Sequence, residues 1–113
     1  MMTRTMMVVA LVAVLAGCRS WARATGDFKV EITGDERAID VSAGRATIRL
    51  LNRGTCPIVV RHGEEQFLLN TSDDKELTLK GTHVLHLERR GLGEGLVEVH
   101  FHAEGRVNTV NLR

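Results

Sequence analysis

Apolar and polar residues alternate with a period of two along most of the chain from residue 28 onwards, and no stretch has the spacing of an amphipathic helix. The segment 28–32 is the clearest case, because its apolar residues take the even positions and its charged residues the odd ones. The same alternation returns in the segments 39–41, 46–50, 56–60, 67–69, 77–79, 85–87, 96–103 and 106–112. This period is typical of strands that bury one face, so the sequence predicts an all-β domain.

Turn-forming residues separate the predicted strands. Clusters rich in Gly, Asn, Asp and Ser lie at 34–36, 52–54, 70–74 and 91–95. Strands that recur every eight to twelve residues or so are typical of a sandwich or a barrel. We therefore expect a small antiparallel β-sandwich of about eight or nine short strands with immunoglobulin-like or Greek-key topology, and a small β-barrel as the structural alternative.

The end of the chain is predicted to form a β-hairpin. If Glu104 and Gly105 occupy a two-residue turn, the segment 97–103 pairs with 106–112. In this register Val99 lies opposite Val110, and the apolar residues of both strands share one face.

The segment 1–18 has the organisation of a bacterial signal peptide. Arg4 precedes an apolar run, 6–16, that is shorter than the roughly 20 residues needed to span a bilayer. The run ends in the segment 15–18 (Leu-Ala-Gly-Cys), which resembles the lipobox of bacterial lipoprotein precursors in all four positions.

The lipobox resemblance implies cleavage between Gly17 and Cys18, with a lipid attached to the thiol of Cys18. The resemblance therefore implies that the chain is attached to a membrane through this lipid. The expected organisation is a lipoprotein signal peptide at 1–17, a lipidated cysteine with a short tether at 18–26, and a β-sandwich domain at 27–113.

The resemblance also bears on location. Arg19 follows the cysteine, where an aspartate would resemble an inner-membrane retention signal, so a Gram-negative source favours the outer membrane, facing the periplasm. The alternative is ordinary signal cleavage after Ala24, because the segment 22–24 has small residues at the required spacing. That cleavage would release a soluble secreted domain that begins at Thr25.

Charge and cysteine content narrow the function classes. Residues 1–17 contain Arg4, one of the 15 Lys and Arg, and none of the 14 Asp and Glu, so the remainder is formally neutral with uncharged histidines. A neutral domain is not steered to nucleic acid. Cys56 is left without an intramolecular partner once Cys18 is lipidated or removed, and its strand parity predicts a buried thiol.

The histidines suggest a metal site. They are His62, His83, His86, His100 and His102. His100 and His102 share one face of one predicted strand and could bind zinc or copper, with Glu98 or Glu104 assisting. His83 and His86 lie three residues apart in a strand and so point to opposite faces. The alternative for all five histidines is that they are exposed polar residues on a solvated sheet face and bind no cofactor.

The sequence contains no signature of an enzyme: no G-x-S-x-G elbow is present, and the glycine-rich segment 91–95 precedes a predicted strand instead of a helix. The leading hypothesis is a lipid-anchored, non-enzymatic binding or structural module of the cell envelope that holds a protein partner by strand addition or through a polar face. The alternative is an envelope protein that binds zinc or copper through His100 and His102.

Overall fold

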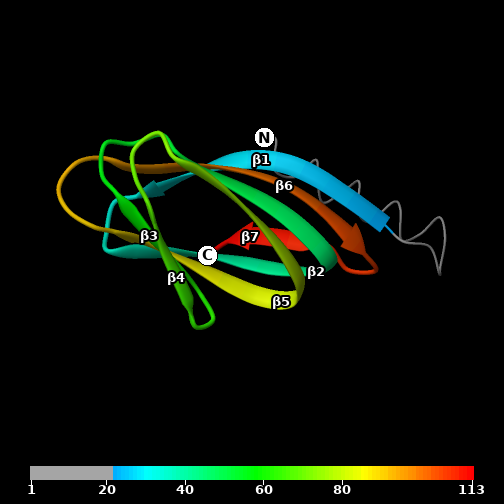
Figure 1. Cartoon of the computed structure of the whole chain (residues 1–113). Helices are drawn as coiled ribbons and strands as arrows, with labels where there is room; N and C mark the ends of the chain where they lie inside the picture. Colours follow the sequence, from blue (N-terminus) through cyan, green and yellow to red (C-terminus); the bar gives the residue numbers. More distant parts are fainter. Residues whose placement is uncertain (1–21) are drawn as a thin grey trace.

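The computed structural model describes residues 22–113, which form an all-β domain with antiparallel pairing throughout. The strands are β1 (Ala22–Ile32), β2 (Glu36–Asn52), β3 (Ile58–His62), β4 (Glu65–Leu69), β5 (Asp74–Arg89), β6 (Gly95–Gly105) and β7 (Thr109–Leu112). Their order is β1-β6-β2-β5-β3-β4, and β7 pairs with β2 (Figure 1). Within residues 22–113, no helix is long and apolar enough to cross a membrane.

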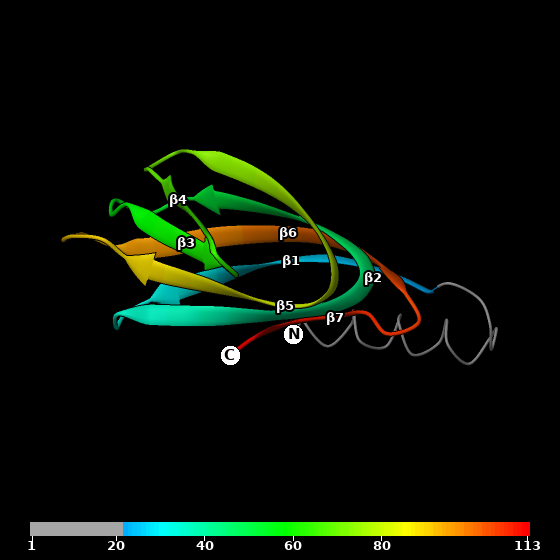
Figure 2. The ribbon, with the colours of Figure 1, turned by 60° about the horizontal axis from the view of Figure 1, so that its bottom comes forward.

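The long strands β2 and β5 run through both layers of the domain. They pair with each other along most of their length, with a register shift between Ala43 and Ala46. Opposite this shift, Gly81 has a φ of 90°, a conformation that glycine adopts without a steric penalty. The bend there folds the β2–β5 pair back over itself, as Figure 2 shows.

The two halves of β2 pair with different strands. In its first half, residues 39–42 pair with β7, and in its second half, residues 45–52 pair with β6. The β6 layer therefore consists of β1, β6 and the adjoining halves of β2 and β5, and the β3 layer consists of β7, the other halves of β2 and β5, β3 and β4.

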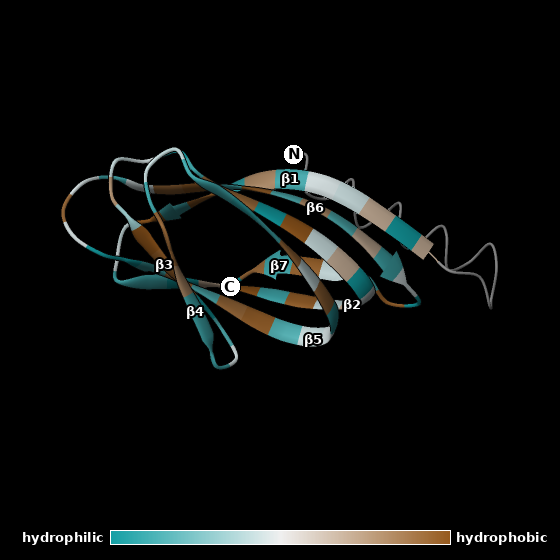
Figure 3. Cartoon of the chain, viewed as in Figure 1, coloured by the Kyte–Doolittle hydropathy of each residue, from teal (hydrophilic) through white to brown (hydrophobic). Residues whose placement is uncertain are grey.

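The core lies between the two layers and is mainly aliphatic, with Phe101 as its one buried aromatic residue among those described. Fully buried side chains come from both, including Ile39, Leu85 and Leu87 in the β3 layer and Ile48 and Val99 in the β6 layer. Alternate positions along the strands are apolar, which Figure 3 shows as alternating colours. This is the one-sided burial that period-two alternation predicts.

The all-β class expected from the sequence is confirmed, and the open antiparallel sheet is consistent with the expected small β-sandwich. The barrel alternative fails within the described residues because β1 and β4 end the strand order and are not paired with each other. The strands are fewer and longer than expected, since 39–41 and 46–50 belong to β2, and 77–79 and 85–87 to β5. The bulge in β2 inverts the phase of the alternation, which in the sequence looks like the end of a strand.

The predicted hairpin of 97–103 with 106–112 is wrong. Strand β6 has β1 on one edge and β2 on the other, so no edge remains for the end of the chain. After Gly105 the chain crosses to the β3 layer, where Val110 lies opposite Val41 instead of Val99.

The expected tether at 18–26 is also too long. Strand β1 begins at Ala22, and both Ala22 and Ala24 are buried against β6. The alternation in 22–26 is carried by alanine and glycine, whose small side chains give a weak hydrophobic signal. Gly17 and Cys18 lie outside the described residues.

At one end of the sandwich, the loops between strands are tightly bonded; this Gly95 end comprises the loops 53–57 and 90–94 with the start of β6. Buried Asn52 donates to Cys56 O (3.0 Å) and Leu69 O (2.9 Å), and its Oδ1 accepts from Gly54 N (2.9 Å). A Cβ on Gly54 would overlap the carbonyl oxygen of Glu94. These contacts hold the loops of the Gly95 end against one another.

Candidate functional site

The outer surface of the β6 layer is polar and has histidines at its centre. His100 and His102 both point outward from β6, as the alternation predicts. Asp27 of β1 and Arg49 of β2 lie directly across from His100, and two threonines flank His102 in the same way. The outer faces of three strands thus bring charged groups from distant segments into rows.

Each of these histidines is bonded to a glutamate of its own strand. His100 Nε2 lies 3.0 Å from Glu98 Oε2, and His102 Nε2 lies 2.9 Å from Glu104 Oε2. A carboxylate only accepts hydrogen bonds, so each Nε2 donates. Because Glu98 and Glu104 lie in opposite directions along β6, the two Nε2 atoms are directed to separate carboxylates and do not converge on one point.

The two carboxylates have lowered pKa values for different reasons. The hydrogen bond from Arg53 (2.8 Å) is the main cause that lowers the pKa of Glu98. The hydrogen bond from His102 is the main cause that lowers the pKa of Glu104, with further contributions from the charges of Arg23 and Arg45. Both glutamates are therefore stabilised as anions by neighbouring donors and cations.

A shallow hollow of about 250 Å³ lies on this surface, lined by Arg45, Thr47, His102 and Glu104. It contains hydrogen-bond donors, a guanidinium and a carboxylate, so it suits a small polar group. Among residues 22–113, no group of three or more His, Cys, Asp or Glu side chains is arranged to hold a metal ion. His100 and His102, the histidines expected to bind zinc or copper, thus share one face, but the carboxylates beside them, Glu98 and Glu104, lie on separate sides of the pair.

The structure pairs two other histidines that the sequence does not connect. His62 Nε2 lies 2.8 Å from His83 Nδ1, and His83 Nε2 lies 2.7 Å from the carbonyl oxygen of Lys80. The carbonyl requires a proton on His83 Nε2, so in the neutral tautomer its Nδ1 accepts from His62. Both rings are half-buried and have inward parity, and they lie at the rim of the core. Only the β3–β5 pairing could reveal this contact.

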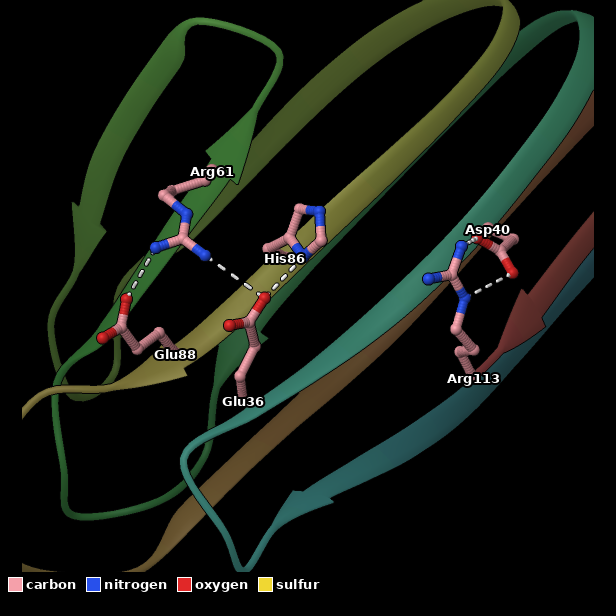
Figure 4. Close-up of polar contacts among 6 residues, drawn as sticks. All are labelled: Glu36, Asp40, Arg61, His86, Glu88 and Arg113. Atoms are coloured by element: carbon pink, nitrogen blue, oxygen red, sulfur yellow. Dashed lines mark hydrogen bonds and ion pairs between the residues drawn. The ribbon is translucent and has the colours of Figure 1, made fainter.

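His86 points outward from the β3 layer, opposite in direction to His83, as the alternation predicts. Figure 4 shows it bonded through Nδ1 to Glu36, which also binds Arg61 (3.2 Å). Arg61 in addition binds Glu88 (3.0 Å). These side chains come from β2, β3 and β5, so this ion-pair cluster links three neighbouring strands.

Cys56 is fully buried, as expected, but it lies in the loop 53–57 instead of in a strand, since β3 begins at Ile58. Its Sγ lies 3.3 Å from Pro57 O and 3.4 Å from Gly91 O, so the thiol hydrogen has carbonyl acceptors within the loops of the Gly95 end. The described residues around it include no base in contact with the sulfur. The thiol therefore packs as a small apolar group.

Comparison with known proteins found no relative of this chain: no family model matches it, and no curated protein or solved structure matches it significantly.

Proposed function

We propose that this chain is a lipid-anchored, non-enzymatic binding module of the bacterial cell envelope. It is held on the membrane by a lipid on Cys18 and binds an extended segment of a protein partner along the free edge of β1. The observation that carries the proposal is the length and regularity of that edge, which begins close to the anchoring residue.

The position of β1 supports membrane attachment of the domain. Only residues 19–21 separate Cys18 from the start of β1 at Ala22. Even a fully extended chain limits the Cα atoms of Cys18 and Ala22 to about 14 Å apart. Signal cleavage after Ala24 would remove three residues of β1, two of which are buried, so the strand favours the lipobox cleavage over the soluble alternative.

The free edge of β1 supports strand addition. Among the described residues β1 pairs only with β6, in an unbroken register of eleven residue pairs without a bulge or proline. The other terminal edges, β4 and β7, have five and four residues. Side chains occupy only the ends of the β1 edge, where Asn108 donates to Ala22 O and Arg37 to Glu31 O. Such an edge is a template for pairing with another chain.

The anchor is tested by mass spectrometry of the amino terminus of the mature protein. The expected result is a diacylglycerol-modified Cys18. An unmodified protein that begins at Thr25 would contradict the anchor and leave a soluble secreted domain.

Strand addition is tested by a photo-crosslinking amino acid placed at Lys29, on the outer face of β1, in membranes of the native host. A partner should crosslink from position 29 and not from position 80, whose lysine is also exposed but lies at the bend of β5. Crosslinking must survive a chelator and the double variant His100→Ala and His102→Ala. Loss under both treatments would instead support the zinc or copper alternative.

A further inference from the structure

Three arginines and an exposed valine gather at the end of the sandwich where β1 begins. We call this the Ala22 end: it comprises the start of β1, the end of β6, the turn 106–108 and the bulge of β2. Arg23 and Arg45 lie on either side of Glu104 in adjacent strands. Arg106 and Val107 follow in the turn, and the side chain of Val107 is 61% exposed.

The turn is fixed against the start of β1. The side-chain amide of Asn108 donates to Ala22 O and to Gly105 O, both at 3.1 Å. On the other side, a Cβ on Gly105 would lie only 2.5 Å from Gly44 N, so the bulge of β2 is in close contact with the end of β6. The arginines of the three elements therefore lie at one end of the domain, next to the residue where the chain continues to Cys18.

The guanidiniums at this end have hydrogen-bond donors available for an external anion, although the charges of Arg23 and Arg45 also act on Glu104, which lies between them. Within residues 22–113, Arg23, Arg45 and Arg106 form no ion pair and no side-chain hydrogen bond, and all are exposed. Elsewhere among the described residues, Arg49, Arg53, Arg61 and Arg113 bind carboxylates, and Arg37 and Arg89 bind backbone carbonyl oxygens. Arg90, in the loop 90–94, is the other exposed arginine without such a partner. The nearby carboxylate of Glu104 is already bonded to His102.

The position of the lipid-carrying residue in the chain determines which end of the domain faces the bilayer. Strand β1 places the Gly95 end about 33 Å from Ala22, because a strand rises about 3.3 Å per residue. The Cα atom of Cys18, the residue that carries the lipid, can lie at most about 14 Å from the Cα atom of Ala22. The Ala22 end is therefore the part of the domain that the anchor brings to the membrane surface.

We infer that the Ala22 end docks on anionic phospholipid, with Arg23, Arg45 and Arg106 against headgroup phosphates and Val107 in the interface. This inference rests on the proposed lipid anchor and deepens it: the lipid attaches the domain, and this surface orients it. A guanidinium binds a phosphate through paired hydrogen bonds. Each basic residue close to an anionic leaflet increases the affinity for the membrane about fivefold. An oriented domain presents the edge of β1 at a constant angle to a partner.

The test uses mature lipoprotein reconstituted into vesicles of phosphatidylcholine with or without phosphatidylglycerol. Trp21, the only tryptophan, is replaced by phenylalanine, and a reporter is introduced by Val107→Trp. The matched control is Leu92→Trp in the same background, because Leu92 is a 93% exposed apolar residue in the loop 90–94 of the Gly95 end, which also contains Arg90. Quenching of fluorescence by lipids brominated in their acyl chains reports contact with the bilayer.

Strong quenching at position 107, little at 92, and a larger difference with phosphatidylglycerol are expected. The triple variant Arg23→Gln, Arg45→Gln and Arg106→Gln should abolish the effect of phosphatidylglycerol. Equal quenching at both positions, or an unchanged triple variant, would overturn the inference.

Mass spectrometry of the same preparation separates the two failures. A lipidated Cys18 with an unquenched position 107 overturns only the docking, whereas a missing lipid overturns the anchor and the docking that depends on it.

Discussion

The two ends of the sandwich use their polar groups in opposite ways. At the Gly95 end, the side chain of Asn52 and the backbone of the loops bond to one another, and Thr55 Oγ1 accepts from Glu94 N at 2.8 Å. At the Ala22 end, Arg23, Arg45 and Arg106 are exposed and form no ion pair within the described residues. The Gly95 end thus bonds its buried polar groups to one another and has one exposed guanidinium without an ion pair among the described residues, that of Arg90, whereas the Ala22 end has three.

This difference separates stability from binding. A buried polar group must find its partners inside the protein, so a residue such as Asn52 is required for the fold. An exposed guanidinium without a partner contributes little to the fold and retains its capacity for an outside anion. Substitutions at the two ends should therefore have different consequences, which the following predictions test in order of expected size.

The largest effect is expected for Gly54→Ala at the Gly95 end. The new Cβ would overlap Glu94 O and lie 2.8 Å from Leu96 N, and both atoms belong to backbone that is bonded in place. We expect a loss of about 3 kcal/mol or more of unfolding free energy, measured in urea. Gly34→Ala is the control, because nothing lies within 4 Å of its added Cβ. Similar losses for both variants would refute the close packing of the Gly95 end.

A somewhat smaller loss is expected for Asn52→Ala. The variant removes the buried side chain that bonds three backbone atoms. These atoms, Cys56 O, Leu69 O and Gly54 N, then lack a hydrogen-bond partner. Such unsatisfied groups cost about 2 kcal/mol in total after partial hydration. Urea unfolding again measures the change, and Asn111→Ala, at an exposed position of β7, should be nearly neutral.

At the Ala22 end, the double variant Arg106→Gln and Val107→Ser should hardly change stability. Both side chains are exposed, so the expected change is within about 0.5 kcal/mol. A loss comparable to that of Asn52→Ala would show that the Ala22 end is also structural and would remove the contrast between the two ends.

The smallest effect concerns the pKa of Glu104. The hydrogen bond from His102 is the main cause that lowers this pKa, so His102→Ala should raise it toward its ordinary value, as followed by NMR titration of the carboxyl carbon. Glu98 is the internal control, because Arg53 is the main cause of its lowered pKa. A shift of Glu98 instead of Glu104 would contradict the assignment.

The sign of the pH dependence follows from the same shift. A carboxyl with a lowered pKa in the folded chain stabilises the fold above its unfolded pKa, and the contribution disappears as the pH falls through the folded value. His102→Ala reduces the difference between the two pKa values. The variant should therefore lose less stability than the parent chain on acidification.

Several features of the site were predictable from local pattern. Alternation assigned His100 and His102 to one outward face and separated His83 from His86. Each of these depends only on which side of a strand a residue occupies. Alternation also predicted that Cys56 is buried, but the residue lies in a loop, so its burial comes from contacts between loops. The cluster of Glu36, Arg61 and Glu88 was not predictable, because its members come from three strands whose order is a long-range property.

The sequence by itself determined the all-β class and the inward and outward faces, because a period of two is a property of neighbouring residues. It also contains the lipobox-like segment from which the proposed anchor follows. Only the tertiary structure decided that β7 pairs with β2 instead of β6, that the bulge near Arg45 joins two predicted strands into one, and that Arg23, Arg45 and Arg106 meet at one end. Strand pairing depends on which edges remain free after the other strands have assembled, and that competition between distant segments is not encoded in any local pattern.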